Sequence, residues 1–122
     1  MKNIKLLVFI FLVDTLSLNA QEPSNLYPLE AKIKYHTDWT KNHYVGRLNE
    51  FSSDPAKDGD IIFIGDSITE GGKTWSSKFN RNNIKNRGIS GDVTDGVIAR
   101  LGEIFYFKPK AVFIMIGVND LF

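Results

Sequence analysis

The stretch "IIFIGDSITEGG", from Ile61 to Gly72, decides the fold. Its opening residues, Ile61–Ile64, are all apolar and give way at once to glycine, aspartate and serine. A short apolar run that ends in turn residues is typical of a fully buried strand. Ser67 therefore follows a strand directly and precedes a predicted helix, so its hydroxyl is expected to stand exposed at the end of the strand.

Further stretches predict buried strands separated by helices. Ile84–Gly88 is a weak strand candidate, whereas Ala111–Gly117 ("AVFIMIG") is apolar throughout. The predicted helices span residues 29–51 in one or two pieces, a short segment with Trp75 and Phe79, and residues 92–107 with Asp92 as the N-cap. Apolar strands that alternate with helices indicate a parallel sheet covered on both faces, which is an α/β fold of three layers.

The N-terminus has the composition of a secretory signal peptide. Lys2 and Lys5 accompany the apolar run Leu6–Val13, and the segment ends in the small residue Ala20. This run is shorter than the roughly 20 residues that cross a bilayer, and its flanks favour an export signal over a buried first strand. The sequence predicts a signal peptide over 1–20, a lead-in and helix over 21–59, and a partial α/β domain over 60–122. The expected product is periplasmic or extracellular, without a stable membrane anchor.

The overall composition limits the function classes. The chain has 122 residues, of which 43% are hydrophobic and 24% charged, as in ordinary folded domains. The formal net charge is only +1, so the sequence indicates no nucleic-acid partner. There is no cysteine, which excludes disulfides and thiolate metal sites.

Each predicted strand ends in a polar turn that contains glycine, namely "GDSIT", "GISGD" and "GVND". The carboxyl ends of parallel strands lie on one edge of a sheet, so Ser67, Gly91 and Asn119 are expected to converge. Ser67 offers a hydroxyl and an N–H, Gly91 an N–H that a ligand can approach closely, and Asn119 amide donors. Donors around a serine hydroxyl are the parts of an oxyanion hole for acyl transfer.

These turns resemble the motifs of the GDSL, or SGNH, hydrolase superfamily. Ser67 in "GDSIT" matches the nucleophile, Gly91 in "NRGISGD" the oxyanion glycine, and Asn119 in "GVND" the oxyanion asparagine. The residues of these motifs are most similar to those of the branch related to platelet-activating-factor acetylhydrolase and carbohydrate acetylesterases. The resemblance covers about residues 60–122 and implies a flavodoxin-like α/β/α sheet ordered 2-1-3-4-5.

The family's base comes from a late D-x-x-H block, which this sequence does not contain. The histidines of the chain are His36 and His43, both of which precede Ser67. In the family their segment is a helix away from the catalytic edge, so we expect both to be exposed or packing residues. We therefore expect the catalytic histidine and aspartate to be absent. The chain is expected to be an N-terminal fragment of a longer esterase, with its third strand left as an apolar edge.

Neighbouring polar residues have supporting roles in this interpretation. Asp66 is expected to fix the turn by accepting backbone hydrogen bonds, and Asp92 to cap a helix. Thr69 and Glu70 are expected at the rim of the pocket or as ordinary polar residues of a first helical turn. No spacing of side chains indicates a metal, and no phosphate-binding loop indicates a nucleotide, so no cofactor is predicted.

Alternative functions remain. The first is an exported serine esterase that acts on short acyl esters, with a small molecule or a glycan as its substrate. The second is a non-catalytic ligand-binding module, which the missing base favours. A flavodoxin-like cofactor binder is disfavoured because "GDSITEGG" lacks enough consecutive backbone donors. The sequence does not determine the oligomeric state.

Overall fold

The computed structural model describes residues 25–122 of the chain. The predicted signal peptide, residues 1–20, lies outside the described residues. Within the described part, one sheet contains three parallel strands: β1 (Ile61–Gly65), β2 (Ile84–Gly88) and β3 (Ala111–Met115), in the order β2-β1-β3. The predicted parallel α/β fold is confirmed, and the strand order agrees with the 2-1-3 part of the sheet that the family resemblance implies.

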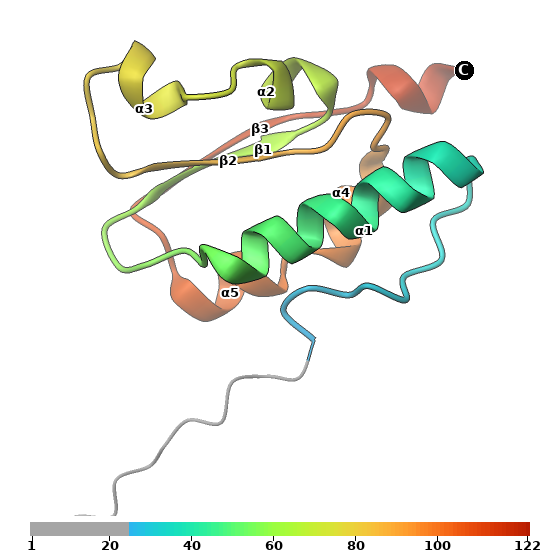
Figure 1. Cartoon of the computed structure of the whole chain (residues 1–122), viewed down its shortest axis with the longest axis horizontal. Helices are drawn as coiled ribbons and strands as arrows, with labels where there is room; N and C mark the ends of the chain where they lie inside the picture. The colour runs from blue at the N-terminus through green and yellow to red at the C-terminus, as the bar shows by residue number, and fades with distance from the viewer. Residues whose placement is uncertain (1–24) are drawn as a thin grey trace, which may run out of the picture.

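Helices cover both faces of this sheet, as Figure 1 shows. On one face lie α1 (Asp38–Ser53), α4 (Thr94–Ala99) and α5 (Gly102–Phe107); on the other lie α2 (Ser67–Gly71) and α3 (Trp75–Lys78). A short 3-10 helix, η1 (Val118–Leu121), follows β3. The described chain therefore has the predicted three layers.

The strand register brings the carboxyl ends of all three strands to one edge. Gly65 at the end of β1 pairs with Gly88 of β2 on one side and with Met115 of β3 on the other. The turns after these residues, and the start of α1, lie on the same side of the sheet in Figure 1. The sheet thereby places the three predicted motifs on a common edge.

Alternating side chains of β1 divide the core between the two faces. Ile62 and Ile64 are buried against Val97 of α4, with Val112 of β3 packed beside them. On the opposite face the ring centroid of Phe63 lies 5.1 Å from that of Trp75. A separate apolar cluster joins α1 to the end of β2 through Tyr44, Leu48, Phe51 and Ile89.

The first helix begins later than the sequence predicts. Residues 29–37 form turns and irregular backbone, and α1 starts only at Asp38. Thr37 is the N-cap, and its hydroxyl accepts a hydrogen bond from the Thr40 N–H at 3.3 Å. The helix starts where the Thr37 hydroxyl caps a backbone N–H. The spacing of apolar residues alone does not show where that cap lies.

The prediction of one continuous helix over residues 92–107 is wrong. The segment is divided into α4 and α5, with N-cap residues Val93 and Leu101, and not Asp92. The break falls at Arg100, whose backbone leaves helical geometry while its side chain donates to the Arg87 carbonyl at 2.7 Å. A buried charged side chain thus overrides the periodic apolar pattern.

The third strand ends two residues earlier than predicted and is exposed. It stops at Met115, before Gly117, whose φ of 120° suits a turn. Phe113, Ile114 and Met115 are 58%, 59% and 47% exposed. In the described sheet β3 is an edge strand, so one of its edges is unpaired and these apolar side chains are exposed beside it.

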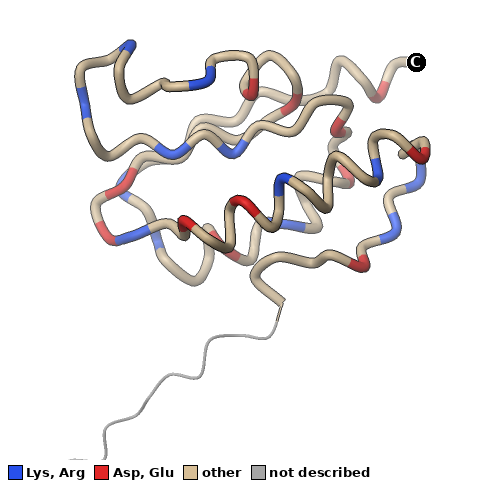
Figure 2. The backbone as a smooth tube through the Cα atoms, viewed as in Figure 1, with Lys and Arg blue, Asp and Glu red and all other residues tan. Residues whose placement is uncertain are grey.

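Charges are interspersed over the described chain, with basic and acidic residues in both helix layers (Figure 2). Among the described residues, no helix is both apolar enough and long enough to cross a bilayer.

Candidate active site

Ser67 stands at the end of β1, as its position in the sequence predicts. It is the first residue of α2, its side chain is exposed, and within residues 25–122 its hydroxyl has no hydrogen-bond partner. Asp66 is the N-cap: it is 1% exposed, and its Oδ1 accepts the Ile68 N–H at 2.9 Å. The aspartate thus fixes the turn as expected and leaves the neighbouring hydroxyl available for chemistry.

Thr69 lies behind this turn and is buried. Its carbonyl accepts a hydrogen bond from the Trp75 Nε1–H at 2.8 Å, which ties α2 to α3. Thr69 also lines an apolar cavity of about 510 Å³ together with Phe63, Trp75 and Met115. It is therefore a wall residue of this cavity, which extends from the carboxyl ends of β1 and β3 along the face of the sheet.

Gly91 lies in the turn that follows β2, and its backbone requires glycine. Its φ is +79°, and a Cβ added there would lie 2.4 Å from Cγ2 of Thr40. The same turn is tied to β1, because the Ile89 N–H donates to the Gly65 carbonyl at 3.0 Å. The left-handed backbone and the close approach of α1 together exclude a side chain here.

Asn119 is in η1, and its side chain contacts the turn that contains Gly91. Nδ2 of Asn119 donates to the Asp92 carbonyl at 2.9 Å. A side-chain amide carries two N–H groups, so this bond orients the side chain and leaves the second N–H for another acceptor. Asp120 holds the same segment: its carboxylate accepts from the Thr94 N–H and the Thr94 hydroxyl, each at 3.1 Å.

Asp92 is a buried ion-pair partner, and the expectation that it caps a helix is wrong. Its Oδ2 lies 2.9 Å from Nη2 of Arg100, and the side chains are 0% and 3% exposed. Burial raises the pKa of Asp92 and lowers that of Arg100, while each charge offsets part of the shift in the other. The Arg100 guanidinium also donates to the Arg87 and Gly65 carbonyls, so this pair fastens α4 to the ends of two strands.

Both histidines are packing residues, as expected, but the expected distance of their segment from the carboxyl edge of the sheet needs correction. Nε2 of His36 lies 3.3 Å from Oδ1 of Asp92, and Nε2 of His43 lies 2.9 Å from Oε2 of Glu70. The start of α1 therefore packs against the carboxyl edge of the sheet and is not remote from it. Each histidine faces a carboxylate, and neither is hydrogen-bonded to Ser67.

Glu70 has contacts that the sequence did not reveal. Its Oε2 accepts hydrogen bonds from the Ser90 N–H and the Ser90 hydroxyl, the latter at 2.6 Å. Partial burial opposes ionisation, but the hydrogen bonds from Ser90 and His43 prevail and lower the pKa of Glu70.

A sequence signal did exist for Arg100, because a charged residue among Val97, Leu101 and Ile104 interrupts an apolar helix face. Nothing local marked Glu70.

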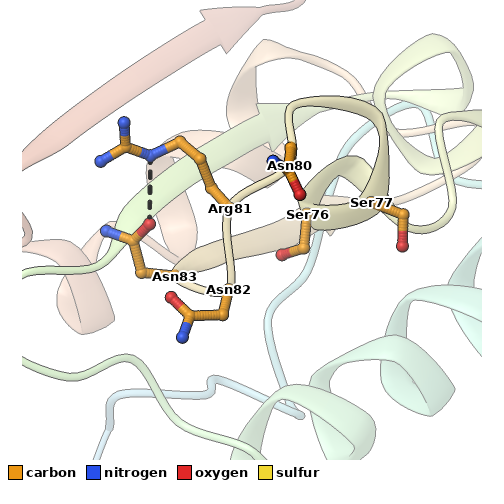
Figure 3. A pocket seen from close by; sticks show the side chains of 6 residues that line it. All are labelled: Ser76, Ser77, Asn80, Arg81, Asn82 and Asn83. Atoms are coloured by element: carbon orange, nitrogen blue, oxygen red, sulfur yellow. Dashed lines mark hydrogen bonds between the residues drawn. The ribbon is translucent and has the colours of Figure 1, made fainter.

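A further hollow on the described surface lies away from Ser67. Ser76, Ser77 and residues 80–83 line an open, polar hollow of about 710 Å³ (Figure 3). Nδ2 of Asn83 donates to the Gly59 carbonyl before β1, so this hollow lies at the amino ends of the strands. It is on the opposite edge from Ser67. Among the described residues, no group of three or more histidine or acidic side chains could hold a metal ion.

Comparison with known proteins is informative for one half of the chain. No curated protein matches the sequence. A family model does match residues 63–122, which contain Ser67, Gly91 and Asn119, and this confirms the family resemblance at its coarse level. This part of the chain is similar to the GDSL-like Lipase/Acylhydrolase family.

Proposed function

We propose that this chain carries the nucleophile and the oxyanion hole of a serine esterase, and that it is a member of the acylhydrolase family that it resembles. One observation carries the proposal: the Asn119 amide is held against the turn of Gly91, at the sheet edge where the Ser67 hydroxyl is exposed. A free hydroxyl beside preorganised N–H donors is the arrangement that acyl transfer requires.

In the proposed reaction Oγ of Ser67 attacks the carbonyl carbon of an ester. The carbonyl oxygen becomes an oxyanion, which the N–H groups of Ser67 and Gly91 and the free N–H of Asn119 stabilise. Collapse releases the alcohol and leaves an acyl-serine, and water then releases the acid and restores the hydroxyl. One donor of this kind typically stabilises the transition state by about 2.7–4 kcal/mol.

The proton of Ser67 needs a base, and none of the described side chains contacts the hydroxyl. His36 and His43 have carboxylate partners at their Nε2 atoms. We propose that the base belongs to a D-x-x-H block that residues 25–122 lack, and that the chain is part of a longer esterase. The unpaired edge of β3 and its exposed side chains Phe113 and Met115 support this. Further strands of a 2-1-3-4-5 sheet would pair with that edge, and their connecting helices would cover its faces.

The proposed substrate class follows from the family branch that the motifs resemble. The proposed substrate is a short acyl ester, such as an acetyl group on a small molecule or a glycan, because the motif residues resemble the branch of acetylhydrolases and acetylesterases. Export of the protein, with cleavage near Ala20, rests on the order of residues in its first 20 positions. N-terminal sequencing of the protein recovered from the cell exterior or periplasm would test the cleavage site.

Two measurements on the protein that includes the proposed D-x-x-H block test the esterase proposal. Hydrolysis of a chromogenic acetate ester is expected to depend on Ser67, and a fluorophosphonate is expected to label Ser67 covalently. Ser67→Ala should abolish both, whereas Ser77→Ala, at an exposed serine of α3, should change neither. Hydrolysis that survives Ser67→Ala would contradict the assignment of the nucleophile.

The second candidate is a non-catalytic binding module, which is favoured because no described base contacts Ser67: His36 and His43 both face carboxylates. Without its base, a catalytic serine loses on the order of 10⁶ in turnover, but the donors around it persist. If the protein is a binding module, a fluorophosphonate should not label Ser67, and the protein should still bind a small anion such as acetate. Stoichiometric labelling of Ser67 would exclude it.

A further inference from the structure

The carboxylate of Glu70 lies where three segments meet. It belongs to α2 and accepts the N–H and the hydroxyl of Ser90, which is in the turn after β2. Both carboxylate oxygens also lie within 3.0 Å of Nε2 of His43, and Nε of Arg47 is 3.7 Å from Oε1. The carboxylate therefore joins α2, the turn after β2 and α1.

The backbone of Glu70 is fixed as firmly as its side chain. Its carbonyl accepts a hydrogen bond from Nδ2 of Asn86 at 3.1 Å. A Cβ added at Gly88 would lie 2.1 Å from the Glu70 nitrogen, so α2 packs directly on the end of β2. The carboxylate thus extends from a rigid point, and its bonds to Ser90 transmit that position to the neighbouring turn.

This contact links two of the proposed site residues. Glu70 is three residues after Ser67 in the same short helix, and Ser90 immediately precedes Gly91. On its far side the same turn is held by Asn119, which donates to the Asp92 carbonyl. The turn is therefore held between Glu70 and Asn119, and loss of either contact would free one side of it.

The charge of Glu70 strengthens this link. Hydrogen bonds from Ser90 and His43 outweigh partial burial and keep the carboxylate ionised at neutral pH. Hydrogen bonds to a charged acceptor are stronger than those between neutral groups. Glutamine at this position could still accept one hydrogen bond, but without the charge.

We propose that Glu70 is a positioning residue: it holds the Ser90–Gly91 turn against the helix of Ser67 and thereby sets the Gly91 N–H relative to the nucleophile. This inference rests on the proposed esterase function. In this proposal Glu70 does not contact the substrate; it acts on the site only by holding Ser90.

Amide exchange and chemical shifts measured by NMR on the full chain test the structural half without any need for activity. In the unmodified chain the Ser90 amide resonance is expected to shift as Glu70 titrates. In Glu70→Gln the Ser90 amide should exchange about tenfold faster, since a charge-assisted bond is replaced by a neutral one. Glu50→Gln is the matched control, because Glu50 is an exposed partner of the same Arg47 and has no bond to Ser90.

Fluorophosphonate labelling of Ser67, in the protein that includes the proposed D-x-x-H block, tests the effect of Glu70 on the proposed reaction. Glu70→Gln should slow the labelling of Ser67 about tenfold, and Glu50→Gln should leave its rate unchanged. If the unmodified chain is not labelled, the esterase proposal fails, and the NMR results alone decide whether Glu70 holds the turn. Unchanged Ser90 exchange in Glu70→Gln would overturn the inference, as would unchanged labelling in a variant whose Ser90 exchange has risen.

Discussion

Nδ2 of Asn119 donates a hydrogen bond to the main-chain carbonyl of Asp92 across 2.9 Å. This bond joins the turn after β3 to the turn after β2, which are 27 residues apart in the chain. It fixes the amide plane of Asn119, so the position of its second N–H is set before any ligand arrives. Preorganised donors of this kind are what electrostatic stabilisation of an oxyanion requires.

Replacement of Asn119 by aspartate should remove both N–H donors at nearly constant shape. Loss of an oxyanion-hole donor lowers turnover by about 10²–10³-fold in comparable sites. Hydrolysis of a chromogenic acetate ester by the protein that includes the proposed D-x-x-H block measures this effect. Asn49→Asp, at an exposed position of α1, is the matched control and should retain activity. Equal losses in the two variants would contradict an oxyanion role for Asn119.

Gly91→Ala should destabilise the fold. The φ of +79° disfavours a side chain, and the new Cβ would lie 2.4 Å from Cγ2 of Thr40, so a loss of about 1–3 kcal/mol is expected. Urea unfolding measures the change. Gly46→Ala is the control: it is exposed, and a Cβ there meets nothing within 4 Å. That change should stabilise α1 by roughly 0.5–1 kcal/mol.

A second variant separates the two causes of the loss at Gly91. Gly91→Ala combined with Thr40→Ser removes the methyl group that the new Cβ would meet, and only the backbone strain remains. The double variant should be more stable than Gly91→Ala alone. If it is not, the clash with α1 contributes nothing and the turn has moved away from Thr40.

The contribution of Glu70 to stability should disappear in acid. Its pKa is lowered in the folded state despite partial burial, because Ser90 and His43 donate hydrogen bonds to it. A lowered folded-state pKa means that the stabilisation is complete above the unfolded pKa and is lost as the pH falls through the folded value. The free-energy difference between the unmodified chain and Glu70→Gln should therefore be largest near neutral pH and shrink on acidification.

Urea unfolding at a series of pH values measures this difference. Glu50→Gln corrects for the change in net charge, because it also removes a carboxylate beside Arg47. A difference between the unmodified chain and Glu70→Gln that is the same at every pH would contradict the proposed ionised contact.

Ile114→Lys should reduce self-association of the described domain. Ile114 is 59% exposed on β3, and an exposed apolar edge strand is a site for pairing with other chains. A lysine on such an edge disfavours pairing with little effect on folding. Ile98→Lys, at an equally exposed position on α4, controls for the gain of charge. Light scattering over a concentration series should show less association for Ile114→Lys than for the control.

Much of the fold followed from local patterns. The apolar runs at Ile61 and Ala111 each end abruptly in glycine and polar residues, and such runs read as buried strands wherever they occur. Alternation with helices then restricts the sheet to a parallel one. Helix ends were less accessible: the start of α1 depends on the Thr37 hydroxyl, and the break before α5 depends on Arg100, which turns inward to pair with Asp92.

The sequence by itself determined the parallel sheet, the turns that carry Ser67, Gly91 and Asn119, and the capping role of Asp66. These features depend on residues close together in the chain, where backbone geometry and polarity act directly. Only the tertiary structure decided the partners of charges: Glu70 with Ser90 and His43, and Asp92 with Arg100 and His36. A carboxylate takes whichever donor the fold brings within about 3 Å, and donors 20 or 56 residues away leave no local mark on the sequence.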